Sequence, residues 1–462
     1  MISKENINRL FAYKADIISV LLLTLTLPLF FYNLGQTSLG SWDEAWYAEI
    51  AKNIIRTGDF LNLTWNGSPY YDHPPFGFWL IAISMKIFGF SEFWVRFPSA
   101  LVGFMGIIAT YFLGKELFNR VVGFSSALAL ASSFWFIYRA RSGNLDVFLT
   151  VLFISTILFA LKAAKSKYYL VPFVITISAL FLTKTLIPFT IIPSILLIFW
   201  KSKYSLKELI APVVSFLIIV GGWVIIQMIN NPAFLTRYFS IGMPGVQIKT
   251  SYLDNLKLSK EYLHNGIGKW FWPGFFSVLG TTFLFQKRFY ILIIFITIFY
   301  IPFIFSSKGH IWHLVPLYPF MIMVFFGFIF VVLERVVRVK NIIYVIIFSI
   351  ALYTSLIQIR QLWYQFIDIS AYTSDEEILS AKAGGFTEDF FIDENFGPAA
   401  VFYSGKNVTK VGNPNLQDFF NEQKSFILIT TKNRLDQADI SGPQYRIIAK
   451  DRDKILILKQ DE

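Results

Sequence analysis

The sequence contains no cysteine among its 462 residues. Disulfide bonds, thiolate nucleophiles and thiolate metal sites are therefore excluded. Charged residues are also scarce, at 15% of the chain against about 25% in a typical globular protein. Hydrophobic residues make up 55%, and 51 of them are phenylalanine. Because a water-soluble fold could not bury this much apolar surface, the composition predicts a protein whose solvent is lipid. It excludes a cytosolic enzyme and a disordered chain.

Basic residues outnumber acidic ones by 41 to 30, but unevenly along the chain. Residues 1–369 hold 30 basic and 15 acidic residues, whereas residues 370–462 hold 11 and 15. This asymmetry predicts a basic membrane domain, 1–368, and a mildly acidic soluble domain, 369–462. Neither part carries a nucleic-acid-binding module, so nucleic acid is not expected as a partner.

Apolar runs of roughly 20 residues, long enough to cross a bilayer, recur along the first domain. They predict an all-α polytopic membrane protein with about eleven transmembrane helices, near 16–35, 97–114, 121–138, 145–161, 168–183, 185–200, 209–229, 271–286, 289–305, 311–333 and 341–359. The first run has a basic start but no small-residue cleavage site, which indicates an uncleaved span.

Basic residues set the expected orientation, because cytoplasmic connections are enriched in lysine and arginine. They fall in alternate connections if the N-terminus is cytoplasmic. The run 168–200 is basic at both ends, so we expect a hairpin that turns at Thr183–Thr185 and places Lys184 at the outer surface. An odd number of spans then puts the C-terminal domain outside, together with the long loops 36–96 and 230–270.

The sequence predicts a small α/β fold for the tail domain. Short apolar runs predict strands at Ala399–Tyr403, Ser425–Thr430 and Ile455–Leu458. The segment Asn415–Gln423 is typical of a helix. No catalytic motif is found in this domain, and a lid or packing module is the expected role.

The first outer loop opens with a pair of carboxylates, Asp43 and Glu44. Hydrophobic residues at 46, 50 and 54 have helical spacing, which predicts an interfacial helix with its apolar face on the bilayer. Asp43 is a candidate general base that the helix N-terminus keeps ionised, and Glu44 is a second catalytic candidate. The alternatives are structural: Glu44 would form a capping box with Ser41, and Asp43 would complement the helix dipole.

The same loop continues with turn signals and then Asp72-His73-Pro74-Pro75. A Pro-Pro pair before an apolar run favours a helix start, and residues 76–88 are too few to span. Asp72 and His73 precede this helix, where free N–H groups favour anion binding. A solvated loop histidine is the alternative for His73.

Charged residues also lie at the outer ends of spans. Arg139, Arg141 and Asp146 join the third and fourth spans, and Lys184 lies in an apolar hairpin. Ionisable residues at such positions are costly and are usually paired or functional. Pairing of Asp146 with an arginine, and snorkelling of Lys184, are the structural alternatives.

Lys308, His310 and His313 join the ninth and tenth spans on the same side. Histidines three residues apart share a helix face, so His310 and His313 could bind a metal with Asp72, His73 or His264. Two such histidines are a weak signal, and neutral loop histidines are the better interpretation.

All these carboxylates and cations gather on one membrane face. This combination suits group transfer from a phosphate-linked donor, because a carboxylate activates the acceptor and cations stabilise the departing phosphate.

In this order, the segments resemble the bacterial membrane glycosyltransferases of the GT-C type, namely the dolichyl-phosphate-mannose–protein mannosyltransferases and the lipid A aminoarabinose transferases. The resemblance rests on residues 43–50, 66–75, 93–100, 140–141 with 146, 181–184 and 316–319. It covers 40–200 well and 300–335 moderately.

The resemblance implies inverting transfer of a sugar from a polyprenyl-phosphate donor to a lipid A, glycolipid, glycan or protein acceptor, on the outer face of the inner membrane. Asp43 matches the base, Asp146 a second acidic position and Lys184 a lysine near the donor phosphate. The expected ligands of that phosphate are Lys184, His73, Arg139, Arg141 and Lys308. The resemblance implies that no cofactor is required, and a bound divalent metal is the alternative. Many relatives have Glu-Lys-Pro-Pro where this chain has Asp72-His73-Pro74-Pro75, which replaces a cation with a mostly neutral ring.

Two other functions remain open. A lipid-linked sugar flippase or secondary transporter would place charges near the bilayer midplane and show two related halves. A non-catalytic scaffold would not need so many ionisable residues on one side.

Overall fold

The structure is a computed structural model that describes residues 4–200, 202, 204–242, 252–284, 286–305, 310–393, 397–411, 416–440 and 444–460. It divides into two compact units. The helical unit comprises Met1–Asn33, Tyr71–Gly77 and Phe97–Ile369, and the mixed unit comprises Leu34–Tyr70, Phe78–Arg96 and Ser370–Glu462. The tail therefore begins close to the expected boundary, but most of loop 36–96 groups with the tail instead of with the spans.

The described part of the helical unit contains helices and no strands. They are α1 (Lys4–Leu23), α2 (Leu27–Phe31), α5 (Glu92–Leu117), α6 (Arg120–Ala131), α7 (Phe134–Ala140), α8 (Asp146–Ala163), α9 (Leu170–Phe181), α10 (Ile192–Phe199), α11 (Leu206–Phe216), α12 (Gly222–Asn230), α13 (Phe234–Gly242), α14 (Tyr252–Ile267), α15 (Phe271–Thr281), α16 (Lys287–Phe305), α17 (Tyr318–Val336) and α18 (Lys340–Leu362). Short 3-10 segments precede several of them, including η3 (Ile187–Ile191) and η6 (Ile311–Leu317).

Among the described residues, seven helices are long and apolar enough to cross a membrane, or eight if the bent pair α6–α7 is one span. The predicted class, a helical multi-span membrane protein with a small C-terminal α/β domain, is confirmed. Three expected spans are shorter helices: 168–183 and 185–200 correspond to Lys167–Phe181 and Ile187–Phe199, and 271–286 contains the 11-residue α15. The count of eleven stays a prediction. The predicted hairpin is confirmed, because the rings of Phe181 and Phe189 pair close to the break and those of Phe173 and Phe199 pair farther from it. The membrane side on which it turns stays a prediction.

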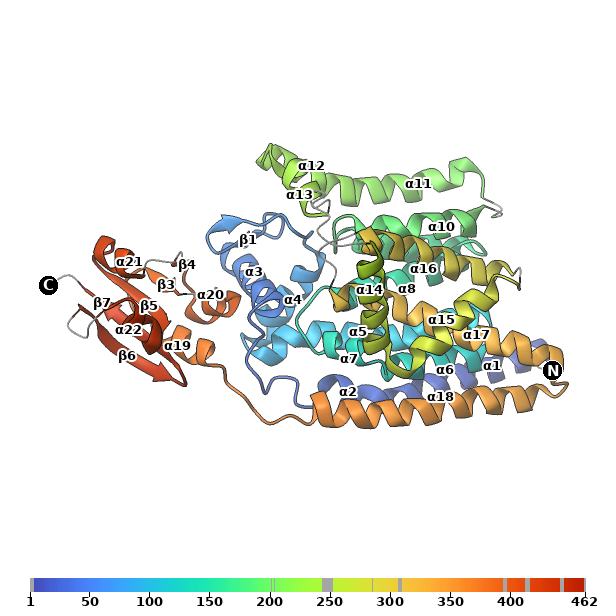
Figure 1. Ribbon diagram of the computed structural model, residues 1–462. Helices are drawn as coiled ribbons and strands as arrows, with labels where there is room; N and C mark the ends of the chain where they lie inside the picture. Colours follow the sequence, from blue (N-terminus) through green and yellow to red (C-terminus); the bar gives the residue numbers. More distant parts are fainter. Residues whose placement is uncertain are drawn as a thin grey trace. The chain divides into compact units, whose positions relative to one another are not determined.

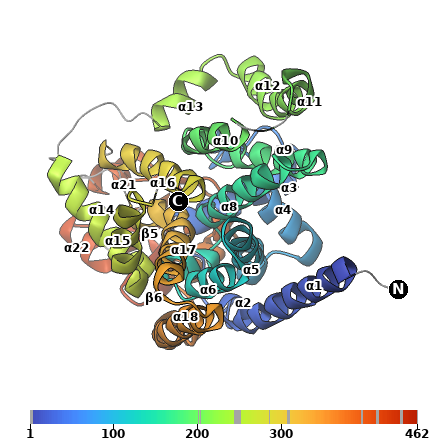
Figure 2. The same cartoon turned by 90° about the vertical axis from the view of Figure 1, so that its right-hand side faces the viewer.

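The spans differ widely in how much protein covers them. The span Ile311–Val336 is 83% buried, whereas the span Lys207–Asn230 is 6% buried. A helix that is apolar all round is stable either inside a protein or against lipid. The span Ile311–Val336 therefore lies at the centre of the bundle. Helices α11 and α12 lie on the opposite side of the bundle from α18 (Figures 1 and 2).

Helices α5 and α6 cross at two glycines, where their backbones touch. A Cβ atom at Gly123 would lie 2.3 Å from the carbonyl oxygen of Tyr111, and one at Gly114 would lie 2.7 Å from the Cα of Gly123. Only glycine permits so close an approach, because any side chain there would overlap backbone atoms.

The mixed unit contains a five-stranded sheet in the order β4-β3-β5-β7-β6. Strand β3 (Phe390–Ile392) pairs in parallel with β4 (Val408–Lys410) and β5 (Phe426–Thr431). Strand β7 (Lys454–Lys459) pairs antiparallel with β5 and with β6 (Arg446–Asp451). Because side chains alternate along β5, the sheet buries two cores: Ile427 and Ile429 face one, and Phe426 and Leu428 face the other.

Two helices cover each face of this sheet. Helices α19 (Asp375–Ala383) and α20 (Pro398–Ser404) contribute to the first core. Helices α21 (Leu416–Glu422) and α22 (Lys432–Gln437) contribute to the second. The tail is thus a three-layer α/β/α domain (Figure 1).

The predicted strands at 425–430 and 455–458 and the predicted helix at 415–423 are confirmed as β5, β7 and α21, although Asn415 lies outside the described residues. The predicted strand Ala399–Tyr403 is wrong, because these residues form helix α20. Pro398 begins this helix, and Gly405 ends it with a left-handed φ of 67°. Five apolar residues are too few for periodicity to distinguish a strand from a buried helix.

Helix α3 (Asp43–Thr57) is buried in protein, so its predicted apolar contact with the bilayer is wrong. Ile50 and Ile54 are 0% and 1% exposed. Trp46 packs against Trp65 and Tyr70, with ring centroids 5.1 and 5.8 Å away. Helix α3 also packs against α20 of the tail. The helical spacing correctly indicated a buried face, but it could not show what covers that face.

A hairpin joins the first loop to the edge of the tail's sheet. Strands β1 (Thr64–Trp65) and β2 (Ser68–Pro69) are linked by Asn66 and Gly67, with φ values of 49° and 75°. Two left-handed residues suit a tight hairpin turn. The Asn66 amide accepts a hydrogen bond from Val408 N at 2.8 Å and donates to Val408 O at 2.9 Å. It thereby satisfies backbone groups at the edge strand β4.

The α5–α6 crossing gives a stability prediction. We expect Gly123→Ala to lower Tm in detergent by several degrees, because overpacking costs about 1–3 kcal/mol. The control is Gly222→Ala, since a Cβ at Gly222 has nothing within 4 Å and helical alanine is favoured over glycine. Equal Tm values for the two variants would contradict the close crossing.

Candidate active site

Asp146 is the centre of a buried charge cluster in the helical unit. Arg139 donates to its Oδ2 atom from Nε at 3.0 Å and from Nη2 at 2.5 Å. Lys184 donates from Nζ to Oδ1 at 2.7 Å. The side chains of the three residues are 4–9% exposed. The expected pairing of Asp146 with an arginine is present, but a second cation shares the carboxylate, so the cluster keeps one net positive charge.

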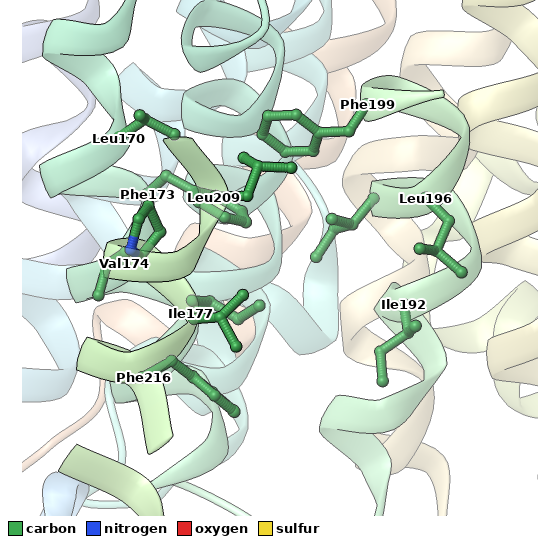
Figure 3. Close-up of a pocket in the computed structure, with 12 residues that line it drawn as sticks. Leu170, Phe173, Val174, Ile177, Ile192, Leu196, Phe199, Leu209 and Phe216 are labelled. Carbon is green, nitrogen blue, oxygen red and sulfur yellow. The ribbon is translucent and has the colours of Figure 1, made fainter. Parts of the chain in front are cut away.

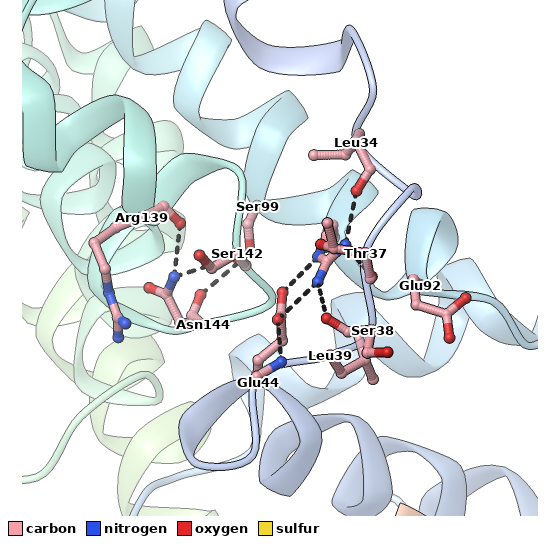
Figure 4. Close-up of polar contacts among 12 residues, drawn as sticks. Leu34, Thr37, Ser38, Leu39, Glu44, Glu92, Ser99, Arg139, Ser142 and Asn144 are labelled. Atoms are coloured by element: carbon pink, nitrogen blue, oxygen red, sulfur yellow. Dashed lines mark hydrogen bonds and ion pairs between the residues drawn. The ribbon is translucent and has the colours of Figure 1, made fainter. Parts of the chain in front are cut away.

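Local structure places these three side chains together. Asp146 begins α8, and its backbone N–H donates to Asn144 Oδ1 at 2.9 Å. Asn144 Nδ2 in turn donates to Arg139 O at 2.6 Å, which closes the turn between α7 and α8 (Figure 4). Lys184 lies in the break between α9 and η3, so the direction of its side chain is not set by a helix.

The Pro-Pro segment is fixed against the same break. Phe76 N donates to Leu182 O at 2.9 Å. A Cβ atom at Gly77 would lie 2.2 Å from Leu145 Cδ2, so glycine lets this segment reach the start of α8. The segment therefore brings His73 close to Lys184 and Asp146, whose charges act on its ring.

His73 is neutral in this position. Burial, together with the Lys184 ammonium, lowers the pKa of His73 to about 3. The ring therefore serves as a hydrogen-bonding group and supplies no positive charge near pH 7. Burial also raises the pKa of the neighbouring Asp72.

Aromatic rings form a wall beside Arg139. The Trp312 ring lies 5.1 Å from the Arg139 guanidinium. His310 stacks on Trp312 with ring centroids 4.5 Å apart and an interplanar angle of 9°. The sequence analysis did not select Trp312 as a site residue. Its position between His310 and His313 is the one sequence feature that could have indicated it.

The metal site considered from the sequence is not assembled. Among the described residues, no three His, Asp or Glu side chains are arranged to hold a metal ion. His310 and His313 face each other's rings. His264 packs against Phe271 and Trp272.

Two further phosphate ligands, Arg141 and Lys308, are expected from the sequence. Arg141 donates to Leu29 O at 3.3 Å and to Tyr32 O at 2.7 Å, at the C-terminal end of α2, where a cation complements the free carbonyls. Lys308 lies outside the described residues.

A wholly apolar pocket of about 300 Å³ lies between α9, α10 and α11. Its lining includes Phe173 and Ile177 of α9, Ile192 and Leu196 of α10, and Phe216 of α11 (Figure 3). Ile177 and Ile192 are the lining residues nearest in sequence to the Lys184 turn. The pocket thus runs along the two helices that meet at a cation of the cluster.

In the mixed unit, Arg96 holds the start of α3. It donates to Glu44 Oε1 from Nε at 2.7 Å and to Glu44 Oε2 from Nη2 at 2.9 Å. Its other N–H groups donate to the carbonyl oxygens of Leu34, Thr37 and Ser38, each at 2.9 Å (Figure 4). All five donors of the guanidinium are thereby used.

These bonds give Glu44 a structural setting that differs from the expected capping box. Glu44 Oε2 accepts from Gly40 N at 2.7 Å, while Ser41 Oγ donates to Glu376 at 2.9 Å. Asp43 is the first residue of α3 and is partly exposed. The Arg96–Glu44 pair therefore fixes the helix terminus that presents Asp43.

Glu49 is a second buried carboxyl on α3 that sequence reasoning did not select. It is 3% exposed, and its nearest cation is Lys52, with Nζ 3.6 Å from Oε2. Burial raises the pKa of Glu49 to about 7, although Lys52 and Arg56 oppose the shift. A carboxyl held near neutrality in a polar cleft is a candidate functional group.

The chain resembles known proteins in part of its sequence and in its fold. The profile of the dolichyl-phosphate-mannose-protein mannosyltransferase family matches residues 72–227. This stretch includes the Arg139–Asp146–Lys184 cluster and His73 but not Asp43. Over 95% of its length, the chain superposes on ArnT from Cupriavidus metallidurans bound to undecaprenyl phosphate, with a TM-score of 0.73, 16% identity and 97% of that chain covered.

The chain has the GT-C fold.

Curated relatives share sequence with only part of this GT-C chain. An uncharacterised protein of Aquifex aeolicus is 36% identical over 129 residues, which cover 28% of this chain and 26% of the relative. An undecaprenyl phosphate-alpha-4-amino-4-deoxy-L-arabinose arabinosyl transferase of Pseudomonas fluorescens is 35% identical over 119 residues, which cover 25% and 20%. The match thus spans about a quarter of the relatives' length.

The raised pKa of Glu49 predicts a pH-dependent stability. The folded pKa of about 7 exceeds the usual 4.5, so the folded protein binds the extra proton between these values. Its stability should fall as pH rises from about 5 to 7, by up to about 3 kcal/mol. We expect Glu49→Gln to raise Tm relative to the wild type at pH 8 but not at pH 5.

The matched control is Glu422→Gln, which changes an exposed carboxyl in the same unit. Its Tm difference from the wild type should be the same at both pH values. If Glu49→Gln behaves like this control, the carboxyl is ionised throughout.

Proposed function

We propose that this protein is a membrane glycosyltransferase that takes a sugar from a polyprenyl-phosphate donor. The observation that carries the proposal is the net positive Arg139–Asp146–Lys184 cluster at the turn between α9 and η3. Two cations that share one buried carboxylate retain the capacity to bind an anion, and a phosphate neutralises the remaining charge.

The apolar pocket supports a lipid-linked donor. A polyprenyl chain needs an apolar surface that leads to its phosphate, and the pocket lies along α9 and α10, the helices that flank Lys184. The ArnT structure with undecaprenyl phosphate and the arabinosyl transferase relatives also support this donor class.

In the proposed reaction, Asp43 accepts the proton of an acceptor hydroxyl or amine. The acceptor's heteroatom then forms a bond to the anomeric carbon as the bond from that carbon to the phosphate oxygen breaks. The sugar is transferred with inversion, and polyprenyl phosphate leaves with the electron pair, stabilised by Lys184 and Arg139. His73 donates or accepts a hydrogen bond as a neutral ring. Asp146 acts as a positioning residue that holds both cations.

The proposal requires no metal, because polyprenyl phosphate is already a good leaving group. We further propose that the N-terminus lies in the cytoplasm and the tail domain outside, since basic connections favour that orientation in a bacterial inner-membrane protein. Pentosyl and hexosyl donors both fit, as do lipid, glycan and protein acceptors.

The general base gives the first functional prediction. Purified protein is incubated with radiolabelled polyprenyl-phosphate sugars and a membrane extract as acceptor, and the release of free polyprenyl phosphate is followed. We expect release by the wild type and a loss of at least about 100-fold in Asp43→Asn, as general bases contribute about 10²–10⁴-fold. Equal release by both would remove Asp43 from this role. No release with any donor would favour the flippase alternative.

Lys184 gives the second functional prediction. Lys184→Met should raise KM for the donor by about tenfold or more, because a charge-assisted hydrogen bond to phosphate is lost. Lys115→Met is the matched control, since Lys115 also pairs with an aspartate, Asp16, that a second cation shares. Similar donor KM values in the two variants would refute a phosphate role for Lys184.

A further inference from the structure

The mixed unit contains a polar cleft of about 440 Å³, and none of its lining residues has a role in the proposed reaction. Glu49, Asn53 and Arg56 of α3 line one side, and Lys406 and Asn407, which follow α20, line the other. Two threonines and two glycines complete the lining. The cleft thus lies where the first loop packs against the tail domain, within one compact unit.

The composition of this lining is unusual for a ligand pocket. Small-molecule sites are lined mostly by apolar and aromatic side chains. Among the described residues that line this cleft, every side chain is polar or charged, and the two glycines contribute backbone. Such a wall favours a ligand that forms hydrogen bonds over most of its surface.

Glu49 is a buried acceptor that the protein leaves unsatisfied. Its Oε2 atom has no hydrogen-bond partner among the described residues. Lys52, its nearest cation, donates instead to Phe402 O at 2.7 Å. Buried polar atoms are normally hydrogen-bonded, so the Glu49 carboxyl, which lines the cleft, keeps hydrogen-bonding capacity for a ligand.

The walls of the cleft are held in place without a ligand. Asn53 Nδ2 donates to Thr64 O at 3.2 Å, and Lys406 Nζ donates to Glu388 O at 2.7 Å. Gly67 lets Asn407 approach the hairpin turn, since a Cβ there would lie 2.7 Å from Asn407 Nδ2. A preformed site loses little conformational entropy when it binds a ligand.

We propose that this cleft binds a neutral carbohydrate ring, the terminal sugar of a glycan or glycolipid acceptor. Vicinal hydroxyls donate to the Glu49 carboxylate and accept from the amides of Asn53 and Asn407 and from Arg56. The identification of the bound sugar as the acceptor rests on the proposed function, whereas binding of the ring does not.

Other ligand classes fit less well. An inorganic anion would meet the Glu49 carboxylate, and a simple amine would meet Arg56 and Lys406. A peptide would find no apolar side chain in the lining. A hydroxyl-rich ring matches the mixture of donors and acceptors.

The test measures binding of methyl glycosides to the full-length protein by saturation-transfer NMR. The protein is kept at pH 8 in a detergent without a sugar headgroup, because maltosides would occupy the site. The probes are the methyl glycosides of glucose, mannose, arabinose, glucosamine and N-acetylglucosamine, and inorganic phosphate is the anion probe.

We expect saturable binding of at least one neutral glycoside by the wild type. Binding should weaken about tenfold or more in Glu49→Gln, which removes a charged acceptor but keeps the shape, and also in Asn53→Ala. Lys382→Ala, an exposed cation of the same unit, should bind like the wild type. Far-UV circular dichroism and Tm identify any variant that fails to fold.

Absence of glycoside binding, binding unaffected in Glu49→Gln and Asn53→Ala, or binding of phosphate alone would each overturn the proposal. Release of polyprenyl phosphate is measured in parallel to separate the two functions. If polyprenyl phosphate is released but no glycoside binds, the carbohydrate site in the cleft is rejected and the proposed transferase activity is supported. Glycoside binding without release supports the cleft as a carbohydrate site and rejects its identification as an acceptor site.

Discussion

The fold of the helical unit and its proposed chemistry both depend on one carboxylate, Asp146, which pairs with two buried cations. Burying an ion costs several kcal/mol unless it is paired and hydrogen-bonded. Arg139 and Lys184 come from segments 45 residues apart, and neither could stay buried in an apolar bundle alone. By pairing with both, Asp146 makes the burial tolerable and still leaves a surplus positive charge. The same contact therefore stabilises the fold and creates the capacity to bind an anion.

In the mixed unit, the buried cation Arg96 has a structural role only. Arg96 uses every N–H group on Glu44 and three backbone carbonyls. No donor remains for a substrate, so the pair acts as a rigid mount for the start of α3. The neighbouring carboxylates differ in setting: Glu44 is paired with Arg96, whereas Asp43 is the first residue of α3 and is partly exposed. Adjacent residues of one type need not share a function.

Local patterns in the sequence were sufficient for the features that depend on neighbours in the chain. Basic residues at both ends of the run 168–200 predicted the hairpin at Lys184, and short apolar runs predicted β5 and β7. Patterns could not identify distant partners. The spacing of Trp46, Ile50 and Ile54 indicated a covered face, but the cover includes α20, some 350 residues later. Arg96 and Glu49 were missed for the same reason, because their roles arise from partners that only the folded chain brings near.

The composition of the mixed unit also has a consequence for biosynthesis. Its first segment leaves the ribosome early, but Ser38 bonds to Glu377 and Asn66 to Val408, more than 330 residues later. At roughly 5–20 residues per second, translation leaves the first loop without its partners for tens of seconds. During that interval α3 exposes an apolar face beside a lipid surface. The tail's part of the cover over this face arrives only when α20 has been synthesised.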